Sequence, residues 1–228
     1  MVDAVVLELE GVVFDTRELR RLSLCDALLE QGFAPTFSQD DVDELAPRAA
    51  IERSLASQDV TYDDVLLDLL LAGVDRAFSS RLTSSGAALC NGAQAFIENA
   101  AASARLAVVT NARRADVDTM LRLASLGDFF TAVITAEDSL EAKPSSESYR
   151  LGIARLAKRR PVTLKRTLAL EHGLTGIRAA RAAGITCVAV GLLPANVAME
   201  ADAYVPVLAG QTIRSLDHFI RTGEEKVQ

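Results

Sequence analysis

The sequence predicts an α/β fold, a doubly wound parallel sheet with an inserted all-helical domain. Five short apolar runs have the pattern of buried strands, at residues 4–9, 106–110, 132–135, 167–171 and 186–190. Amphipathic helical patterns separate most of these runs, and such alternation favours parallel strands joined by helices. The stretch 17–90 instead carries helical patterns and no clear strand, which indicates an insertion after the first strand.

The predicted helices of the α/β part cover residues 92–103, 115–126, 145–158 and 174–184. Pro144 is placed as a helix start, and Gly184 as the residue after a helix end. The insertion shows three helical patterns, at residues 17–32, 39–58 and 62–82. We therefore expect an α/β core domain at 1–16 and 91–228 and a helical domain at 17–90. An insertion at this point would lie over the carboxyl edge of the sheet, where ligands bind in open α/β folds.

Composition limits the classes of partner. The chain has 228 residues, half of them hydrophobic, which suffices for a full core in one large domain or one domain with an insert. Its formal net charge of −7 argues against a general nucleic-acid partner or an anionic membrane partner, because phosphate groups attract basic surfaces. One basic cluster flanks Pro161 and is interpreted as a solvated connection: Lys158, Arg159, Arg160, Lys165 and Arg166.

The cysteines and the apolar runs bear on location. Cys25, Cys90 and Cys187 are widely spaced among apolar neighbours, which favours buried reduced thiols over a zinc site or a disulfide framework. The chain enters its first strand almost at once, and no apolar run is long enough to span a bilayer. We expect a cytoplasmic protein.

Glu8 and Glu10 end the first predicted strand, and Gly11 follows them in a tight turn. At strand periodicity, two acids two residues apart share one face. Such a pair can bind a hard divalent cation or divide into a nucleophile and an acid/base. The alternative interpretation is a pair of solvated acids at a strand end.

Three further segments support the first interpretation: LAVVTNA at 106–112, EAKPSSESY at 141–149 and LALEHGLTGIRAARAAG at 168–184. With the opening AVVLELEGVVFDT, they resemble the haloacid dehalogenase (HAD) superfamily of phosphatases and phosphomutases. The resemblance is to its β-phosphoglucomutase and phosphoglycolate phosphatase branch and covers essentially the whole chain. It implies a Rossmann-like core, a helical cap over residues 17–90 and phosphatase chemistry with magnesium.

The resemblance also assigns roles by position. Glu8 and Glu10 stand where the family has its nucleophilic and acid/base aspartates. Thr110, Asn111 and Lys143 stand where the family holds and neutralises the phosphoryl group. Glu8, Glu10, Glu171 and His172 stand at the positions of the magnesium site.

Several positions depart from the family pattern. Glutamate displaces its carboxylate by about 1.5 Å relative to aspartate, and a misplacement of about 1 Å can cost a factor of 10² in rate. His172 is a poor ligand for magnesium, which prefers oxygen. It could join Glu8 and Glu171 around a softer metal, or simply fill space. The segment 45–49 also lacks the glycine of the cap's substrate-reading pattern, so the substrate cannot be transferred from relatives.

These departures leave three hypotheses. The first is a catalytically silent member, a pseudoenzyme that keeps phosphate or anion binding at Thr110 and Lys143 or serves a protein partner. The second is an active metal-dependent phosphatase that acts on a small phosphorylated metabolite through Glu8. The third is a protein-interaction module without a ligand.

Overall fold

The computed structural model describes residues 2–38, 47–158 and 160–222. Its chain divides into two compact units, Met1–Asp15 with Ala88–Gln228, and Thr16–Ala87. The predicted boundaries, after residues 16 and 90, lie one and three residues further along the chain.

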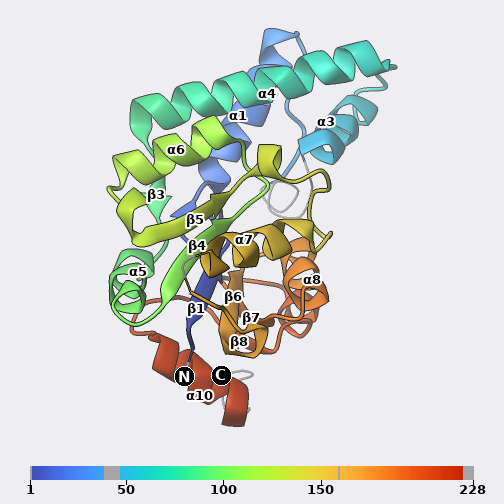
Figure 1. Ribbon diagram of the computed structural model, residues 1–228. Coiled ribbons are helices and arrows are strands. Elements are labelled where there is room, and N and C mark those ends of the chain that lie inside the picture. The colour runs from blue at the N-terminus through green and yellow to red at the C-terminus, as the bar shows by residue number, and fades with distance from the viewer. Residues whose placement is uncertain (1, 39–46, 159, 223–228) are drawn as a thin grey trace. The chain divides into compact units, whose positions relative to one another are not determined.

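A six-stranded parallel sheet forms the centre of the first unit, with the order β5-β4-β1-β6-β7-β8 (Figure 1). The first strand, β1 (Ala4–Leu7), pairs with β4 (Arg105–Val109) on one side and with β6 (Thr167–Glu171) on the other. The remaining strands extend the sheet on both sides of this trio: β5 (Phe130–Ile134), β7 (Thr186–Val190) and β8 (Ala203–Val205). The carboxyl ends of all six strands thus lie at one edge.

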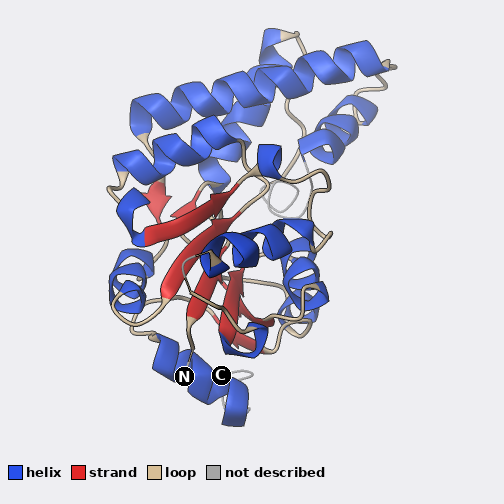
Figure 2. Cartoon of the chain, viewed as in Figure 1, coloured by secondary structure: helices blue, strands red, loops and turns tan. Residues whose placement is uncertain are grey.

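Helices cover both faces of the sheet, because its central strands are buried along nearly their whole length. Val6, Val109 and Ile134 pack in one cluster with Tyr149, Leu156 and Ile177. These last three come from α7 (Glu147–Ala157) and α8 (Leu174–Ala182), which therefore cover one face. The alternate residues Val5, Leu7, Leu106 and Val108 are also fully buried, so both faces are covered. Helices flank the strands in Figure 2.

The other elements of this unit are shorter or more peripheral. A two-stranded antiparallel ribbon joins β2 (Phe14–Asp15) to β3 (Ala88–Leu89). Two longer helices, α5 (Ala93–Ala101) and α6 (Arg114–Leu123), precede and follow β4, and α10 (Ile213–Thr222) comes last. The short helices are η1 (Gly127–Phe129), η2 (Ala136–Asp138), η3 (Leu164–Arg166) and α9 (Ala195–Ala198).

The predicted doubly wound parallel sheet is present, with differences in detail. The first strand ends at Leu7, so Glu8 and Glu10 lie beyond it rather than on a strand face. The strand β8 was missed because AYV is short and follows the polar residue Asp202. Of the cysteines, Cys187 is buried as expected, whereas Cys25 and Cys90 are only partly buried.

The second unit consists of helices in its described part: α1 (Arg17–Glu30), α3 (Pro47–Ala56) and α4 (Asp64–Ser85). Asp63 begins α4 by accepting a hydrogen bond from the Leu66 amide. A shared apolar core holds the three helices together, through residues such as Leu24, Leu28, Ile51, Leu55, Leu67 and Leu70.

Two segments from the sequence analysis fall partly on this unit. The predicted helix at 39–58 and the segment 45–49 begin outside the described residues. Within the segment, Arg48 pairs with Glu52 at 3.0 Å and with Asp64 at 3.5 Å. Over the described part of the chain, no helix is long and apolar enough to cross a membrane.

Gly92, the N-cap residue of α5, tests the close packing of the backbone at the start of this helix. It has a φ of +84°, and a Cβ there would lie 2.0 Å from the Ala209 nitrogen. We expect Gly92→Ala to lower the free energy of unfolding by roughly 3 kcal/mol, because it adds a backbone clash to a strained φ. Gly127→Ala is the control, since a Cβ there meets nothing within 4 Å. Urea denaturation would compare the two, and equal stabilities would contradict this packing.

Candidate active site

Three of the predicted site residues follow or end neighbouring strands at the carboxyl edge of the sheet. Glu8 follows β1 and its amide donates to the Leu170 carbonyl at 2.9 Å. Thr110 follows β4, and Glu171 is the last residue of β6. Because β4, β1 and β6 are adjacent, the parallel pairing itself brings these side chains together.

Lys143 joins this edge from the loop between β5 and α7. Its ammonium donates to Glu8 Oε2 at 2.5 Å, to Glu171 Oε1 at 2.5 Å and to the Val109 carbonyl at 2.8 Å. The Lys143 side chain is only 2% exposed. An ammonium has three N–H donors, so all of them are committed within the protein.

The Glu8 carboxylate has both oxygens engaged. While Oε2 pairs with Lys143, Oε1 accepts from the Leu9 amide at 2.7 Å. The glutamate side chain therefore folds back over the backbone that follows it. Glu10, half-buried, begins the turn that bridges to Phe14.

Thr110 and Asn111 each accept a hydrogen bond from a backbone amide of the loops at this edge of the sheet. The Thr110 hydroxyl accepts from the Ala112 amide at 3.2 Å, and the Thr110 side chain is buried. Asn111 Oδ1 accepts from the Lys143 amide at 3.2 Å. Asn111 thus helps to position the lysine that spans the two glutamates.

His172 is packed into the backbone. Its Nδ1 lies 2.8 Å from the Val190 carbonyl, and because a carbonyl only accepts, we assign the proton to Nδ1. The ring fits against two glycines: a Cβ on Gly11 or on Gly191 would lie within 2.4 Å of it. The imidazole therefore occupies space that those glycines leave open.

Tyr149 completes the network and was missed by the sequence analysis. Its hydroxyl donates to Glu171 Oε1 at 2.5 Å, and the side chain is fully buried. The sequence marks Tyr149 only by its place at the end of EAKPSSESY. On an apolar helix face, a tyrosine with this role cannot be distinguished from an ordinary core residue. Tyr149, Glu171, Lys143 and Glu8 form one continuous buried chain of hydrogen bonds.

A profile of the haloacid dehalogenase-like hydrolase family matches residues 5–190. The chain belongs to this family. Protein CbbY of Cereibacter sphaeroides is 27% identical over 197 residues, covering 82% of this chain and 84% of that protein.

Solved structures of HAD proteins share the fold. CbbY from Rhodobacter sphaeroides in complex with phosphate has a TM-score of 0.78 at 23% identity, covering 95% of this chain and 100% of that one. A predicted phosphoglycolate phosphatase from Haemophilus somnus 129pt has a TM-score of 0.80 at 16% identity, with coverage of 95% and 98%. A β-phosphoglucomutase from Clostridium difficile also matches. These matches confirm the resemblance and the fold class predicted from the sequence.

Magnesium, which the HAD resemblance implies, does not fit these side chains. Lys143 places a positive charge between Glu8 and Glu171, and His172 turns its Nδ1 to a carbonyl. Among the described residues, no three His, Cys, Asp or Glu side chains converge as a metal site. The softer-metal alternative through Glu8, Glu171 and His172 lacks the required convergence as well.

Burial sets the electrostatics of the network. Burial raises the pKa of Glu171 to about 7, while Lys143 lowers it and Glu8 raises it. Burial would lower the pKa of the Lys143 ammonium, but Glu171 and Glu8 together raise it above its usual value. Burial and Glu171 raise the pKa of Tyr149 well above its usual range. Near neutral pH, Lys143 is therefore charged, Tyr149 is a neutral donor and Glu171 is partly protonated.

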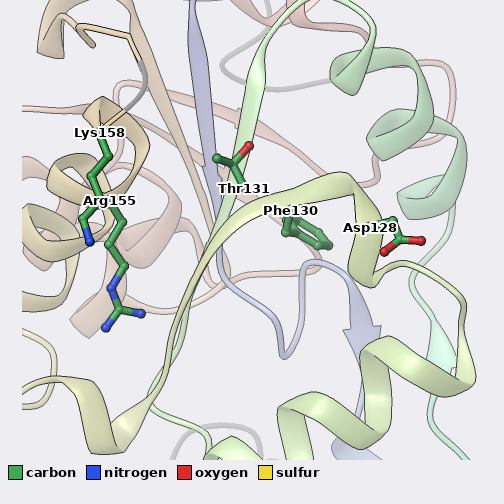
Figure 3. A pocket seen from close by; sticks show the side chains of 5 residues that line it. All are labelled: Asp128, Phe130, Thr131, Arg155 and Lys158. Carbon is green, nitrogen blue, oxygen red and sulfur yellow. The ribbon is translucent and has the colours of Figure 1, made fainter.

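Two cavities lie near the outer edge of the sheet. The larger, of about 510 Å³, is lined by Arg155 on α7, by Lys158 directly after this helix, and by Asp128, Phe130 and Thr131 (Figure 3). Its lining includes none of the predicted site residues. The smaller, of about 180 Å³, is lined by Thr110, Asn111, Thr135, Ser139 and Ser148, among others.

Two arginines lie beside β5, the outermost strand on one side of the sheet. Arg155 donates to the Val133 carbonyl of β5 at 2.9 Å, and Arg114 donates to the same oxygen at 3.2 Å. Asp138 pairs with both guanidinium groups. The outward carbonyl of Val133 is thus bonded within the chain.

The pH dependence of stability tests the buried Glu171. Its folded pKa lies above the usual 4.5, so its contribution is fully present below pH 4.5 and is lost as pH rises through about 7. We expect the free energy of unfolding to fall by on the order of 2 kcal/mol between pH 5 and pH 8 from this group. Glu171→Gln should remove this component. Denaturant titrations at both pH values measure the free energy of unfolding. An equal change in wild type and variant between the two pH values would refute the raised pKa of Glu171.

Metal addition tests the misfit of magnesium. A ligand that binds the folded state raises the melting temperature by mass action. We expect the wild type to melt at the same temperature with magnesium, with manganese or with EDTA. A rise in melting temperature with metal that Glu8→Gln abolishes would show that a metal displaces Lys143 from Glu8.

Proposed function

We propose that this protein is a catalytically silent member of the HAD-like hydrolase family. The observation that carries the proposal is the Lys143 ammonium, which donates to Glu8, Glu171 and the Val109 carbonyl at once. In this proposal, the site of phosphoryl transfer has become a buried structural ion-pair network.

The state of Glu8 supports the loss of chemistry. A nucleophilic carboxylate needs an oxygen free to approach phosphorus in line. Both Glu8 oxygens accept hydrogen bonds, one of them charge-assisted, which stabilises the carboxylate before any reaction. The longer side chain also turns this carboxylate toward the Leu9 amide.

The balance of charge disfavours phosphate binding at the position where the family holds its phosphoryl group. Glu8 and Glu171 share the single positive charge of Lys143 at this edge of the sheet. Without a divalent cation, a phosphate dianion would meet net negative charge. The CbbY structure contains phosphate, so the fold accepts this anion where the side chains permit it.

A protein of this family without catalytic activity functions by binding. Its ligand is then either a small anion or a protein partner. The net charge of −7 supports a role away from nucleic acids and anionic membranes.

Phosphate release from a broad panel of small phosphate esters, with magnesium and then with manganese, tests the silence. We expect wild-type turnover no greater than that of Glu8→Gln. The triple reversion Glu8→Asp, Glu10→Asp, His172→Asp should gain metal-dependent turnover, because it restores shorter nucleophile and acid/base side chains and an oxygen ligand.

The same assay contains the result that would overturn the proposal. Wild-type turnover that depends on metal and disappears in Glu8→Gln would establish an active phosphatase with a glutamate nucleophile. Glu141→Gln is a control variant, since Glu141 is an exposed acid close to Lys143 in the sequence.

A further inference from the structure

The larger cavity, of about 510 Å³, lies beside β5 and shares no lining residue with the Lys143 network. Its lining comes from η1, from β5, and from α7 with the residue that follows this helix, all within the α/β unit. The volume falls in the range of about 300–1,000 Å³ that is typical of small-molecule sites. The cavity is therefore large enough for a ligand of its own.

Two opposite charges in this lining have no partner in the protein. Among the described residues, neither Lys158 nor Asp128 makes a hydrogen bond or an ion pair, and both side chains are exposed. Figure 3 shows Lys158 on one side of the cavity and Asp128 on the other. A ligand can thus reach both charges without breaking a contact within the chain.

Arg155 adds hydrogen-bond donors on the side of Lys158. Its Nη1 donates to the Val133 carbonyl and its Nη2 to Asp138. A guanidinium has five N–H donors, so three remain without an acceptor in the described part of the chain. Because Asp138 already pairs with Arg155, Lys158 is the cation on this side that lacks a counter-ion.

The strand β5 is irregular at this cavity. Consecutive residues of β4 pair with Phe130 and with Ala132, so Thr131 is an extra residue between two paired positions. Such bulges redirect side chains and are common at sheet edges and beside functional sites. The Thr131 side chain is exposed, lines the cavity and has no hydrogen-bond partner among the described residues. The irregularity thus presents a hydroxyl, which can donate or accept, between the two charges.

The lining favours a ligand that carries both charges. A simple anion would be attracted by Lys158 but repelled by the unpaired carboxylate of Asp128, and a simple cation would meet the reverse. A ligand with a negative group at one end and a positive group at the other is attracted at both sides. The apolar side chain in the lining, Phe130, is buried, so little apolar surface is offered to the ligand.

We propose that this cavity binds a small zwitterion whose carboxylate and ammonium stand at opposite ends, of the dipeptide class. The carboxylate lies against Lys158 and the remaining N–H donors of Arg155, the ammonium lies against Asp128, and the Thr131 hydroxyl bonds to the peptide unit between them. An α-amino acid has both charges on one carbon and does not extend from one side to the other. The proposal goes beyond the loss of catalysis at Glu8 and does not depend on it.

Calorimetric titration of glycylglycine at low salt tests this site. We expect the wild type to bind, and Asp128→Asn and Lys158→Gln each to bind about tenfold more weakly, because each loses a charge-assisted hydrogen bond. Asp118→Asn and Lys165→Gln are matched controls that should bind as the wild type does, since these residues are exposed and do not line the cavity. All four variants change exposed side chains, and circular dichroism melts would show that each is folded.

Blocked dipeptides assign each end of the ligand to its side of the cavity. N-acetylglycylglycine lacks the ammonium, so the wild type should bind it about tenfold more weakly than glycylglycine, whereas Asp128→Asn should bind the two equally. Glycylglycine amide lacks the carboxylate, so its difference from glycylglycine should shrink in Lys158→Gln.

Three results would overturn the proposal. The first is no binding of glycylglycine by the wild type. The second is binding that Asp128→Asn and Lys158→Gln change no more than their controls do, which would place the dipeptide elsewhere. The third is tighter binding of N-acetylglycylglycine than of glycylglycine, which would identify a site for simple anions. The phosphate-release assay decides the silence of Glu8 separately.

Discussion

The Lys143 ammonium is the interaction on which the site depends. It reaches from the loop after β5 to the ends of β1, β4 and β6 and is bonded at each of them. Without it, Glu8 and Glu171 would be two like charges facing each other at the ends of adjacent strands, with Glu171 inside the core. A buried pair of this kind is strongly destabilised when one partner is removed. The lysine therefore serves the fold as much as any chemistry.

The surrounding residues are arranged around that charge. Tyr149 donates to the same Glu171 oxygen that Lys143 uses, and Asn111 holds the Lys143 amide. His172 takes no part in the ion pairs and instead packs against Gly11 and Gly191. The imidazole therefore fills the space between the two glycines, with its Nδ1 at the Val190 carbonyl.

Much of this could be predicted from the sequence, because apolar runs alternating with helical patterns specify a parallel sheet, and the motif spacings place Glu8, Thr110, Lys143 and Glu171 at one edge. The contacts could not be predicted. Whether the extra methylene of Glu8 carries its carboxylate forward or back over Leu9 depends on side-chain torsions that no spacing encodes. Tyr149 was inconspicuous because a helix face gives no sign of which polar group lies against a buried charge.

The two arginines that donate to β5, Arg114 on α6 and Arg155 on α7, have a consequence for the protein in solution. This strand is the last of its sheet on one side, and an exposed strand edge can recruit a strand from another molecule. Arg114 and Arg155 occupy the outward carbonyl of Val133, and Asp138 fixes both of them. An incoming strand would have to displace two guanidinium groups to pair there. The two arginines thus protect this position of the strand edge against pairing with another molecule.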